Sequence, residues 1–289
     1  MNLVMIGTGY VGLTTGVGFA KLGHNVACVD IDAGKIARLD LGEVPFYEPG
    51  VAQALKEVQA QGRILFTTDL KDVIGGADVI MLAVGTPPKS TGEADLRALF
   101  AAADQVGTFL EHEAVVVVKS TVPVGTNRQV LERIRAAMTQ AGREQLTSLI
   151  HIVSVPEFLR EGTAMRDFLA SDRVVIGADD GIAAQTIDKL HEGIKAPRVI
   201  TSIESAELIK YAANAFLATK ISFINEIANL ADRVGADVRD IAHGIGLDPR
   251  IGPHFLRAGI GYGGSCFPKD VSALEQLSGS HGYTFKLLS

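Results

Sequence analysis

Short apolar runs alternate with helix-length amphipathic stretches along the N-terminal part of this 289-residue chain, and this alternation restricts the fold most. Runs that are apolar at successive positions are typical of strands covered on both faces, and helices between them are typical of a parallel sheet. The sequence therefore predicts an α/β fold, a Rossmann-like doubly wound parallel sheet. The runs are Leu3–Ile6, Asn25–Asp30, Ile64–Phe66, Val79–Val84, Val115–Lys119 and His151–Val155.

The pattern changes after Ser202. Arg173–Gly177 and Val199–Thr201 are predicted as further strands, and one long helix, without proline or interior glycine, is predicted from Ile203 to about Val234. Shorter helices interrupted by glycine and proline follow. We expect a Rossmann-type domain over residues 1–202, and over 203–289 the long connecting helix with a small all-helical domain.

Charge and cysteine content limit the kinds of molecule that the chain is expected to bind and the setting in which it is expected to work. A formal net charge of −6 gives no electrostatic reason to bind nucleic acid or an acidic membrane, and no apolar stretch resembles a signal peptide or a spanning helix. Cys28 and Cys266 lie too far apart to indicate a disulfide framework, which favours a reduced, cytoplasmic setting. No metal site is expected, since Lys195 stands where a zinc motif beginning at His191 needs its second histidine.

A glycine motif lies directly between the first predicted strand and the first helix. It runs from Gly7 through Gly9, Tyr10 and Val11 to Gly12, the spacing of a dinucleotide-binding turn whose helix N-terminus faces the pyrophosphate. Asp30 ends the second predicted strand, where a carboxylate can accept hydrogen bonds from ribose hydroxyls and would repel a 2′-phosphate. These residues predict NAD as the cofactor.

Three other polar residues lie where a cofactor would be reached. Lys35 could neutralise cofactor oxygens or be a solvated surface lysine. Thr86 and Thr121 follow the fourth and fifth strands, at the sheet edge where open α/β sheets bind ligands, although threonines there also cap loops.

Candidate reactive groups are concentrated in the C-terminal part. Cys266 lies in a glycine-rich approach to a predicted helix, with Lys269 and Asp270 close by, and is either an activated nucleophile or a small buried side chain. Lys210 and Asn214 share one face of the long helix and could jointly hold a substrate oxygen, with Glu207 one turn earlier on that side.

Two carboxylates follow the sixth strand. Glu157 and Glu161 lie four residues apart and could transfer protons, or they could simply begin a helix.

In combination these segments resemble the UDP-glucose/GDP-mannose dehydrogenase family from the first residues to nearly the last. The matching segments are Gly7–Gly12, Tyr47–Gly50, Val84–Pro87, Ser120–Thr126, Pro156–Gly162, Lys210–Leu217 and Gly263–Asp270.

The resemblance implies an NAD-dependent enzyme, expected to be a homodimer, that oxidises UDP-glucose twice to UDP-glucuronate. Lys210, Asp270 or a water takes the alcohol proton, Cys266 forms a thiohemiacetal and then a thioester, and Asn214 assists Lys210 at the oxyanion. Glu157 or Asp270 would activate the hydrolytic water, which Thr121 helps to place.

The same likeness assigns binding roles. Glu161 and Lys269 would approach NAD. The sugar nucleotide would contact Glu157, Phe158, Leu159, Arg160, Glu161, Lys210, Asn214, Phe255, Leu256, Arg257, Ala258, Gly259 and Gly263.

Two departures and several alternatives remain. Val155 replaces an asparagine usual in the family. Members of the family continue through a third, Rossmann-like domain that covers the nucleotide, so the chain is expected to be truncated. Its apolar end at Phe285–Leu288 is expected to have little sequence to pack against. UDP-N-acetylmannosamine or GDP-mannose could replace UDP-glucose. A single-step 3-hydroxyacid-type dehydrogenase and a non-catalytic fragment that binds NAD and a sugar nucleotide are the competing functions.

Overall fold

The computed structural model describes residues 1–264 and 266–288. The chain divides into two compact units. Unit 1 comprises Met1–Thr86 and Asp95–Glu207, and unit 2 comprises Pro87–Ala94 and Leu208–Ser289. The division falls inside the long helix α9 (Ile203–Val234).

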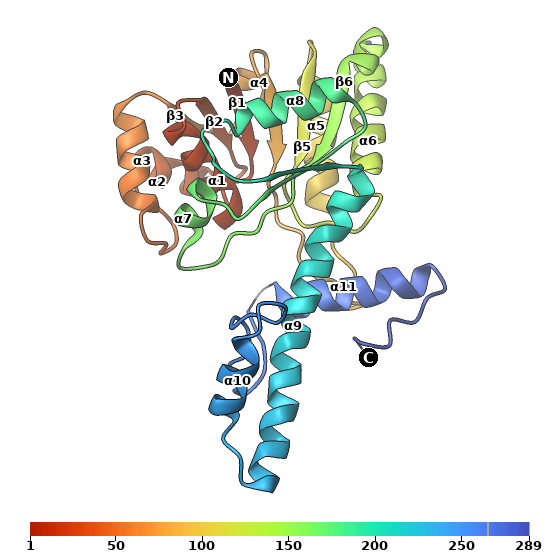
Figure 1. The fold of residues 1–289 in the computed structure, drawn as a ribbon. Helices are drawn as coiled ribbons and strands as arrows, with labels where there is room; N and C mark the ends of the chain where they lie inside the picture. Colours follow the sequence, from red (N-terminus) through yellow and green to blue (C-terminus); the bar gives the residue numbers. More distant parts are fainter. Residues whose placement is uncertain (265, 289) are drawn as a thin grey trace. The chain divides into compact units, whose positions relative to one another are not determined.

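Unit 1 contains an eight-stranded sheet with the order β3-β2-β1-β4-β5-β6-β7-β8. The first six strands are parallel, and their order, 3-2-1-4-5-6, is that of a dinucleotide-binding doubly wound sheet, so the predicted fold class is confirmed (Figure 1). The strands are β1 (Asn2–Ile6), β2 (Asn25–Val29), β3 (Ile64–Thr67), β4 (Val79–Leu82), β5 (Ala114–Val118), β6 (Ile150–Ser154), β7 (Val174–Ala178) and β8 (Arg198–Thr201).

Strands β7 and β8 run against the first six strands of the sheet. Strand β7 pairs antiparallel with β6 through only Val153 with Ala178 and Ser154 with Gly177, and β8 is parallel to β7. The sequence predicted both strands but not this reversal, because a strand buried on both faces has the same apolar pattern in either direction. The beginning of β7 extends past the end of β6.

Helices cover both faces of the sheet. One core contains buried residues of α1, α2, α3, α7 and α8, and the other contains buried residues of α4, α5 and α6. Along β1, Leu3 and Met5 face the first core, whereas Val4 and Ile6 face the second, as the two-residue period of a strand requires. The helices are α1 (Tyr10–Lys21), α2 (Ala33–Asp40), α3 (Val51–Ala60), α4 (Lys71–Ile74), α5 (Arg97–Phe109), α6 (Thr126–Gln140), α7 (Ala164–Leu169) and α8 (Gly181–Leu190), with the short 3₁₀-helix η1 (Glu144–Leu149).

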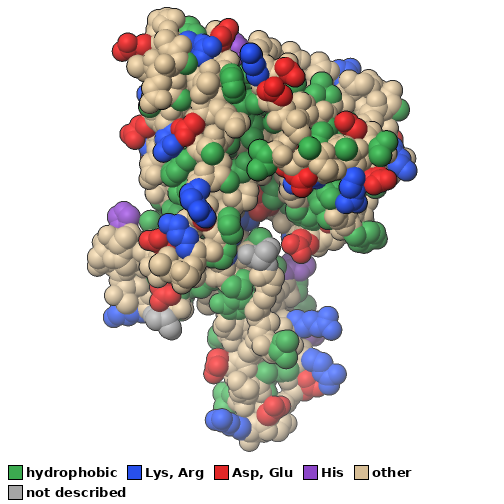
Figure 2. Space-filling view, turned by 180° about the vertical axis from the view of Figure 1, so that it is seen from behind, with side chains coloured by type: hydrophobic (Ala, Val, Ile, Leu, Met, Phe, Trp, Pro, Cys, Tyr) green, Lys and Arg blue, Asp and Glu red, His purple; other side chains and the backbone are tan. Residues whose placement is uncertain are grey.

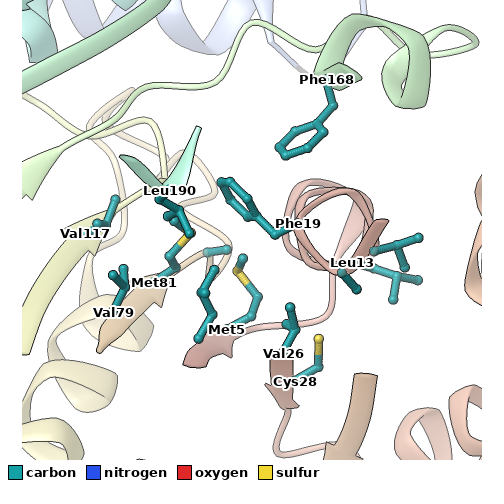
Figure 3. Packing of buried hydrophobic residues seen from close by; sticks show 14 of the residues in the cluster. Met5, Leu13, Phe19, Val26, Cys28, Val79, Met81, Val117, Phe168 and Leu190 are labelled. Carbon is teal, nitrogen blue, oxygen red and sulfur yellow. The ribbon is translucent and has the colours of Figure 1, made fainter. Parts of the chain in front are cut away.

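Two phenylalanine rings pack against each other in the first core. Phe19 of α1 meets Phe168 of α7 edge to face at 4.9 Å between ring centroids, beside Met5 of the sheet (Figure 3). Cys28 lies in the same core, where burial raises the pKa of its thiol to about 12. Cys28 is therefore a packing residue and not a reactive thiol.

Unit 2 contains the rest of α9 together with α10 (Val238–Gly246) and α11 (Phe267–Ser280). Its core is built by Tyr211 and Ala215 of α9 and by Ala273 and Leu274 of α11. In the apolar C-terminal stretch, Phe285 and Leu288 are partly buried against this core, whereas Leu287 is 68% exposed.

The surface carries charges of both signs. On the face drawn in Figure 2, acidic and basic side chains are interspersed among apolar and polar ones. None of the helices in the described part of the chain combines the length and apolarity needed to span a bilayer, and residues 1–264 and 266–288 contain no cluster of three or more His, Cys, Asp or Glu side chains able to hold a metal ion.

Candidate active site

The glycine turn between β1 and α1 is shaped by close backbone packing. Gly7 has φ +99°, and a Cβ built there would lie 2.7 Å from the Ala83 carbonyl oxygen; a Cβ on Gly12 would lie 1.9 Å from the Gly7 carbonyl oxygen. Gly9 is different, since no atom of residues 1–264 or 266–288 lies within 4 Å of its Cβ position. Gly7 and Gly12 thus hold helix against strand, while Gly9 keeps the approach to the turn open.

The N-terminus of α1 is suited to an anion. No side chain caps Gly9, the N-cap residue, and the first turn carries no acidic residue. The helix dipole and the amide groups of this turn therefore favour a phosphate group. With the open position at Gly9, the turn fits the pyrophosphate of a dinucleotide.

Asp30, directly after β2, is held beside this turn. Its Oδ2 accepts hydrogen bonds from the Thr8 amide at 2.9 Å, the Thr8 hydroxyl at 2.7 Å and Lys35 Nζ at 2.9 Å. Burial opposes ionisation, but these hydrogen bonds lower the pKa of Asp30 to about 2. Asp30 is therefore an ionised acceptor fit for ribose hydroxyls, and Lys35, which the sequence left open, is paired with it.

The loops after β4 and β5 are bonded to each other. The Thr86 hydroxyl donates to the Thr121 carbonyl oxygen at 2.9 Å, and the Ser120 hydroxyl donates to the Val84 carbonyl oxygen at 2.6 Å. The structure thus brings Thr86 and Thr121 together at the carboxyl edge of the sheet, where the sequence placed both.

The segment after β6 folds back on itself. Glu157 is buried, and its Oε2 accepts a hydrogen bond of 2.7 Å from the Leu159 amide. Arg160 forms an ion pair with Asp167, and the guanidinium of Arg173 lies 3.8 Å from the centroid of the Phe158 ring. Glu161, four residues beyond Glu157, is exposed. The two carboxylates therefore occupy different environments.

A buried carboxylate outside the predicted site residues ties this segment to α1. Glu48 accepts hydrogen bonds from the Tyr10 hydroxyl at 2.6 Å, the Gly162 amide at 2.7 Å and the Ala164 amide at 2.9 Å. Burial and this hydrogen bond raise the pKa of Tyr10, so the phenol stays a donor. The sequence marked Tyr47–Gly50 only as a matching segment, and a lone glutamate in a turn does not indicate such partners.

In unit 2, Asp270 is the centre of a buried polar group. Asn214 Nδ2 donates to its Oδ2 at 2.6 Å, Lys269 Nζ donates to its Oδ1 at 2.7 Å, and its backbone amide donates to the Cys266 carbonyl oxygen at 2.8 Å. Lys210, one turn from Asn214 on α9, is also buried. Cys266 is exposed as the N-cap residue of α11. The structure thus connects the side chains of Asn214, Lys269 and Asp270, and Cys266 lies one helical turn before Asp270.

The remaining predicted residues of unit 2 follow α10. Phe255 has φ +63°, Leu256 is buried, and the Gly259 amide donates to Asn225 Oδ1 of α9 at 2.8 Å. Leu256, Arg257 and Ala258 line a pocket with α10. Gly263 is exposed, and Ser265 in the same glycine-rich segment lies outside the described residues.

Glu207, one turn before Lys210 on α9, makes its hydrogen bonds within unit 1. Its carboxylate accepts hydrogen bonds from the Gly125 amide at 2.7 Å and from the amide and side chain of Asn127 at 2.9 and 2.7 Å, which places it at the N-terminus of α6. Burial raises the pKa of Glu207, an effect that these hydrogen bonds partly offset. Glu207 anchors α9 to α6 within unit 1, and helical spacing alone could not reveal that partner.

Comparison with known proteins gives consistent matches over the whole chain. Residues 1–195 match the family model described as the NAD-binding domain of the UDP-glucose/GDP-mannose dehydrogenase family, and residues 204–289 match its central domain. The chain is 52% identical over 287 residues to UDP-glucose 6-dehydrogenase TuaD of Bacillus subtilis, a match that covers 99% of the chain and 61% of that relative.

Two solved dehydrogenase structures are also similar to this chain. A UDP-glucose dehydrogenase from Pyrobaculum islandicum matches with a TM-score of 0.93 and 42% identity, over 99% of this chain and 66% of that one. A GDP-mannose dehydrogenase from Pseudomonas aeruginosa matches with a TM-score of 0.82 and 32% identity, over 100% of this chain and 66% of that one.

Proposed function

Because the chain belongs to the UDP-glucose/GDP-mannose dehydrogenase family, we propose that it carries out the NAD-dependent twofold oxidation of UDP-glucose to UDP-glucuronate. The observation that carries the proposal is an exposed cysteine, Cys266, at the start of the same helix turn as Asp270, whose buried carboxylate is held by Asn214 and Lys269. A dehydrogenase needs such a nucleophile only if an aldehyde must be captured and oxidised again.

Unit 1 supplies the cofactor site. NAD, when bound, accepts one hydride in each of the two oxidations. The turn at Gly7, Gly9 and Gly12 would hold the pyrophosphate, with Tyr10 and Val11 in the first turn of α1, and Asp30 would accept from the ribose. Thr86, Thr121, Glu161 and Lys269 are proposed as further cofactor contacts.

The first oxidation needs a proton acceptor. As the substrate alcohol loses hydride, Lys210, Asp270 or a water that they hold takes the hydroxyl proton. The Cys266 thiolate then adds to the aldehyde carbon, and Lys210 and Asn214 donate hydrogen bonds to the resulting oxygen anion.

The second oxidation ends in hydrolysis. Loss of a second hydride converts the thiohemiacetal into a thioester on Cys266. A water placed by Thr121 gives a proton to Glu157 or Asp270 and attacks the thioester carbon, which releases the carboxylate and the thiol. Net consumption is two NAD and one water per sugar.

The proposed substrate class is taken from the names of similar proteins. One is called UDP-glucose 6-dehydrogenase and another GDP-mannose dehydrogenase, and the chain spans 61% of the first. We propose UDP-glucose because the identity to that relative is higher. The segment 157–161, the segment 255–259 and Gly263 are proposed to bind the sugar nucleotide, and UDP-N-acetylmannosamine and GDP-mannose are the substrates to test against it.

A homodimer is proposed from one exposed stripe. Phe216, Phe223 and Leu230 recur every seven residues on α9 and are 65%, 52% and 55% exposed. A seven-residue apolar repeat is typical of a helix that packs along another helix. Light scattering should give twice the chain mass, and Phe223→Glu should give the monomer; a wild-type monomer at high concentration would refute the proposal.

The mechanism also needs a reduced Cys266, so we propose a reducing compartment such as the cytoplasm.

NADH absorbance with limiting UDP-glucose and excess NAD tests the function. Two NADH per sugar are expected. One NADH would point to the single-step dehydrogenase. No NADH with any of the three sugar nucleotides, while NAD still binds, would point to the non-catalytic alternative.

A further inference from the structure

A small cavity lies inside unit 1, behind the segment that carries Glu157. Its walls come from α1, the end of β5, the segment after β6 and the end of α8, and they include Thr15, Lys119, Glu157 and His191. It is partly open and has room for about 50 Å³ of water, more than the roughly 10–15 Å³ that one water molecule needs by this measure. The cavity is therefore large enough for water.

One hydroxyl in its wall has no hydrogen-bond partner among the described residues. Thr15 is completely buried, and its Oγ1 makes no hydrogen bond to any described residue. An unsatisfied buried hydroxyl is unfavourable, and such groups usually bond to internal water. Thr14, its neighbour on α1, is equally buried and equally unsatisfied, but it does not line the cavity.

The wall also offers acceptors and charges. His191 Nδ1 lies 2.7 Å from the Ile187 carbonyl oxygen and must donate to it, which leaves Nε2 as an acceptor in the neutral ring. Burial and the nearby Lys119 ammonium lower the pKa of His191 to about 3, so the ring is neutral at ordinary pH. Lys119 and Glu157, 7% and 8% exposed, place opposite charges on the same wall.

We propose that this cavity binds ordered water, which accepts from the Thr15 hydroxyl, donates to His191 Nε2 and to the Glu157 carboxylate, and so positions Glu157 for the hydrolysis of the thioester. Three such partners are typical of a buried water molecule. The water site is inferred from the cavity and from the buried Thr15 hydroxyl, and it does not depend on the proposed activity. Its part in hydrolysis rests on the proposed function.

The water site can be tested by thermal denaturation, which needs no enzymatic activity. The test is whether each substitution lowers or raises Tm. Thr15→Val removes a partner from bound water and should lower Tm by about 2–4 °C. Thr14→Val, the matched control on the same helix, replaces an unsatisfied hydroxyl by a methyl group and should leave Tm unchanged or raise it. If Thr15→Val also leaves Tm unchanged or raises it, or if both variants lower it equally, the water site is refuted.

The proposed role of this water in positioning Glu157 is tested by kinetics. In Thr15→Val, the first NADH should form at the wild-type rate, while steady-state turnover falls about tenfold because the thioester on Cys266 accumulates and becomes detectable by mass spectrometry. Thr15→Ser, which keeps the hydroxyl, should restore turnover. Equal slowing of both phases, or no slowing, would refute the role. A wild-type protein that forms no NADH would refute the proposed function and leave the stability test intact.

Discussion

The side-chain amide of Asn214 donates a hydrogen bond of 2.6 Å to Oδ2 of Asp270 and joins α9 to α11 within unit 2. Asp270 is 1% exposed, so its carboxylate depends on protein donors, and Lys269 supplies the second one. Because α11 begins beside Cys266, this bond also fixes the backbone that carries the thiol.

Asn214→Ala should therefore destabilise the protein by about 1–3 kcal/mol, since it leaves one oxygen of a buried carboxylate without its donor. Urea denaturation measures the change. Asn229→Ala, on the exposed face of the same helix, is the matched control and should change stability by less than about 0.5 kcal/mol. Equal effects of the two substitutions would show that the bond to Asp270 adds nothing.

Cys266→Ala should abolish formation of the uronate, because no thioester can form, while the affinity for NAD is unchanged. Cys266→Ser should behave in the same way, since a serine hydroxyl is a far weaker nucleophile at neutral pH. Product analysis and NAD titration measure the two properties separately. Uronate production by the alanine variant at the wild-type rate would exclude the covalent mechanism.

Protonation of His191 at acid pH should lower the folding stability of unit 1. Burial lowers the pKa of His191 to about 3 from the usual 6.5, so the folded state binds fewer protons than the unfolded state between these values. The stability that the neutral ring contributes is complete above pH 6.5 and is lost toward pH 3, by at most about 1.4 kcal/mol per pH unit. His191→Gln should flatten this dependence, whereas the exposed control His281→Gln should keep it. An unchanged slope in His191→Gln would contradict the assignment.

Gly107 allows α5 and α6 to approach closely. A Cβ at this position would lie 2.3 Å from the Ile134 carbonyl oxygen and 2.7 Å from the Ala137 Cβ. Gly107→Ala should cost about 1–3 kcal/mol in spite of the better helix propensity of alanine. Gly181→Ala, in the same unit, meets nothing within 4 Å and should be neutral or stabilising. A stabilised Gly107→Ala variant would mean that the two helices separate without cost.

The order of strands and helices was predictable from sequence because buried strands and amphipathic helices have different apolar periods. The long helix is the clearest case, since its predicted span coincides with α9, Ile203–Val234. The reversal of β7 was not predictable, because direction is decided by pairing with β6 and leaves no mark on the apolar pattern of Val174–Ala178.

For the candidate site, sequence identified residues whose chemistry is visible in a motif, such as Cys266 and Asp30. It could not identify Glu48, whose partners lie more than a hundred residues away at Gly162 and Ala164. Sequence placed Glu207 one turn before Lys210 but could not name its partners at Gly125 and Asn127, because spacing on a helix says which residues share a face but not what packs against that face.

The two-residue overlap between β6 and β7 also bears on how the sheet comes apart. Neighbouring strands elsewhere in the sheet share four or five paired positions, whereas this junction has two. Because fewer bonds must break together there, β7 and β8 form the segment most readily detached when the domain is pulled or partly unfolded. Under mechanical load the six parallel strands would behave as one body and the last two as its hinged end.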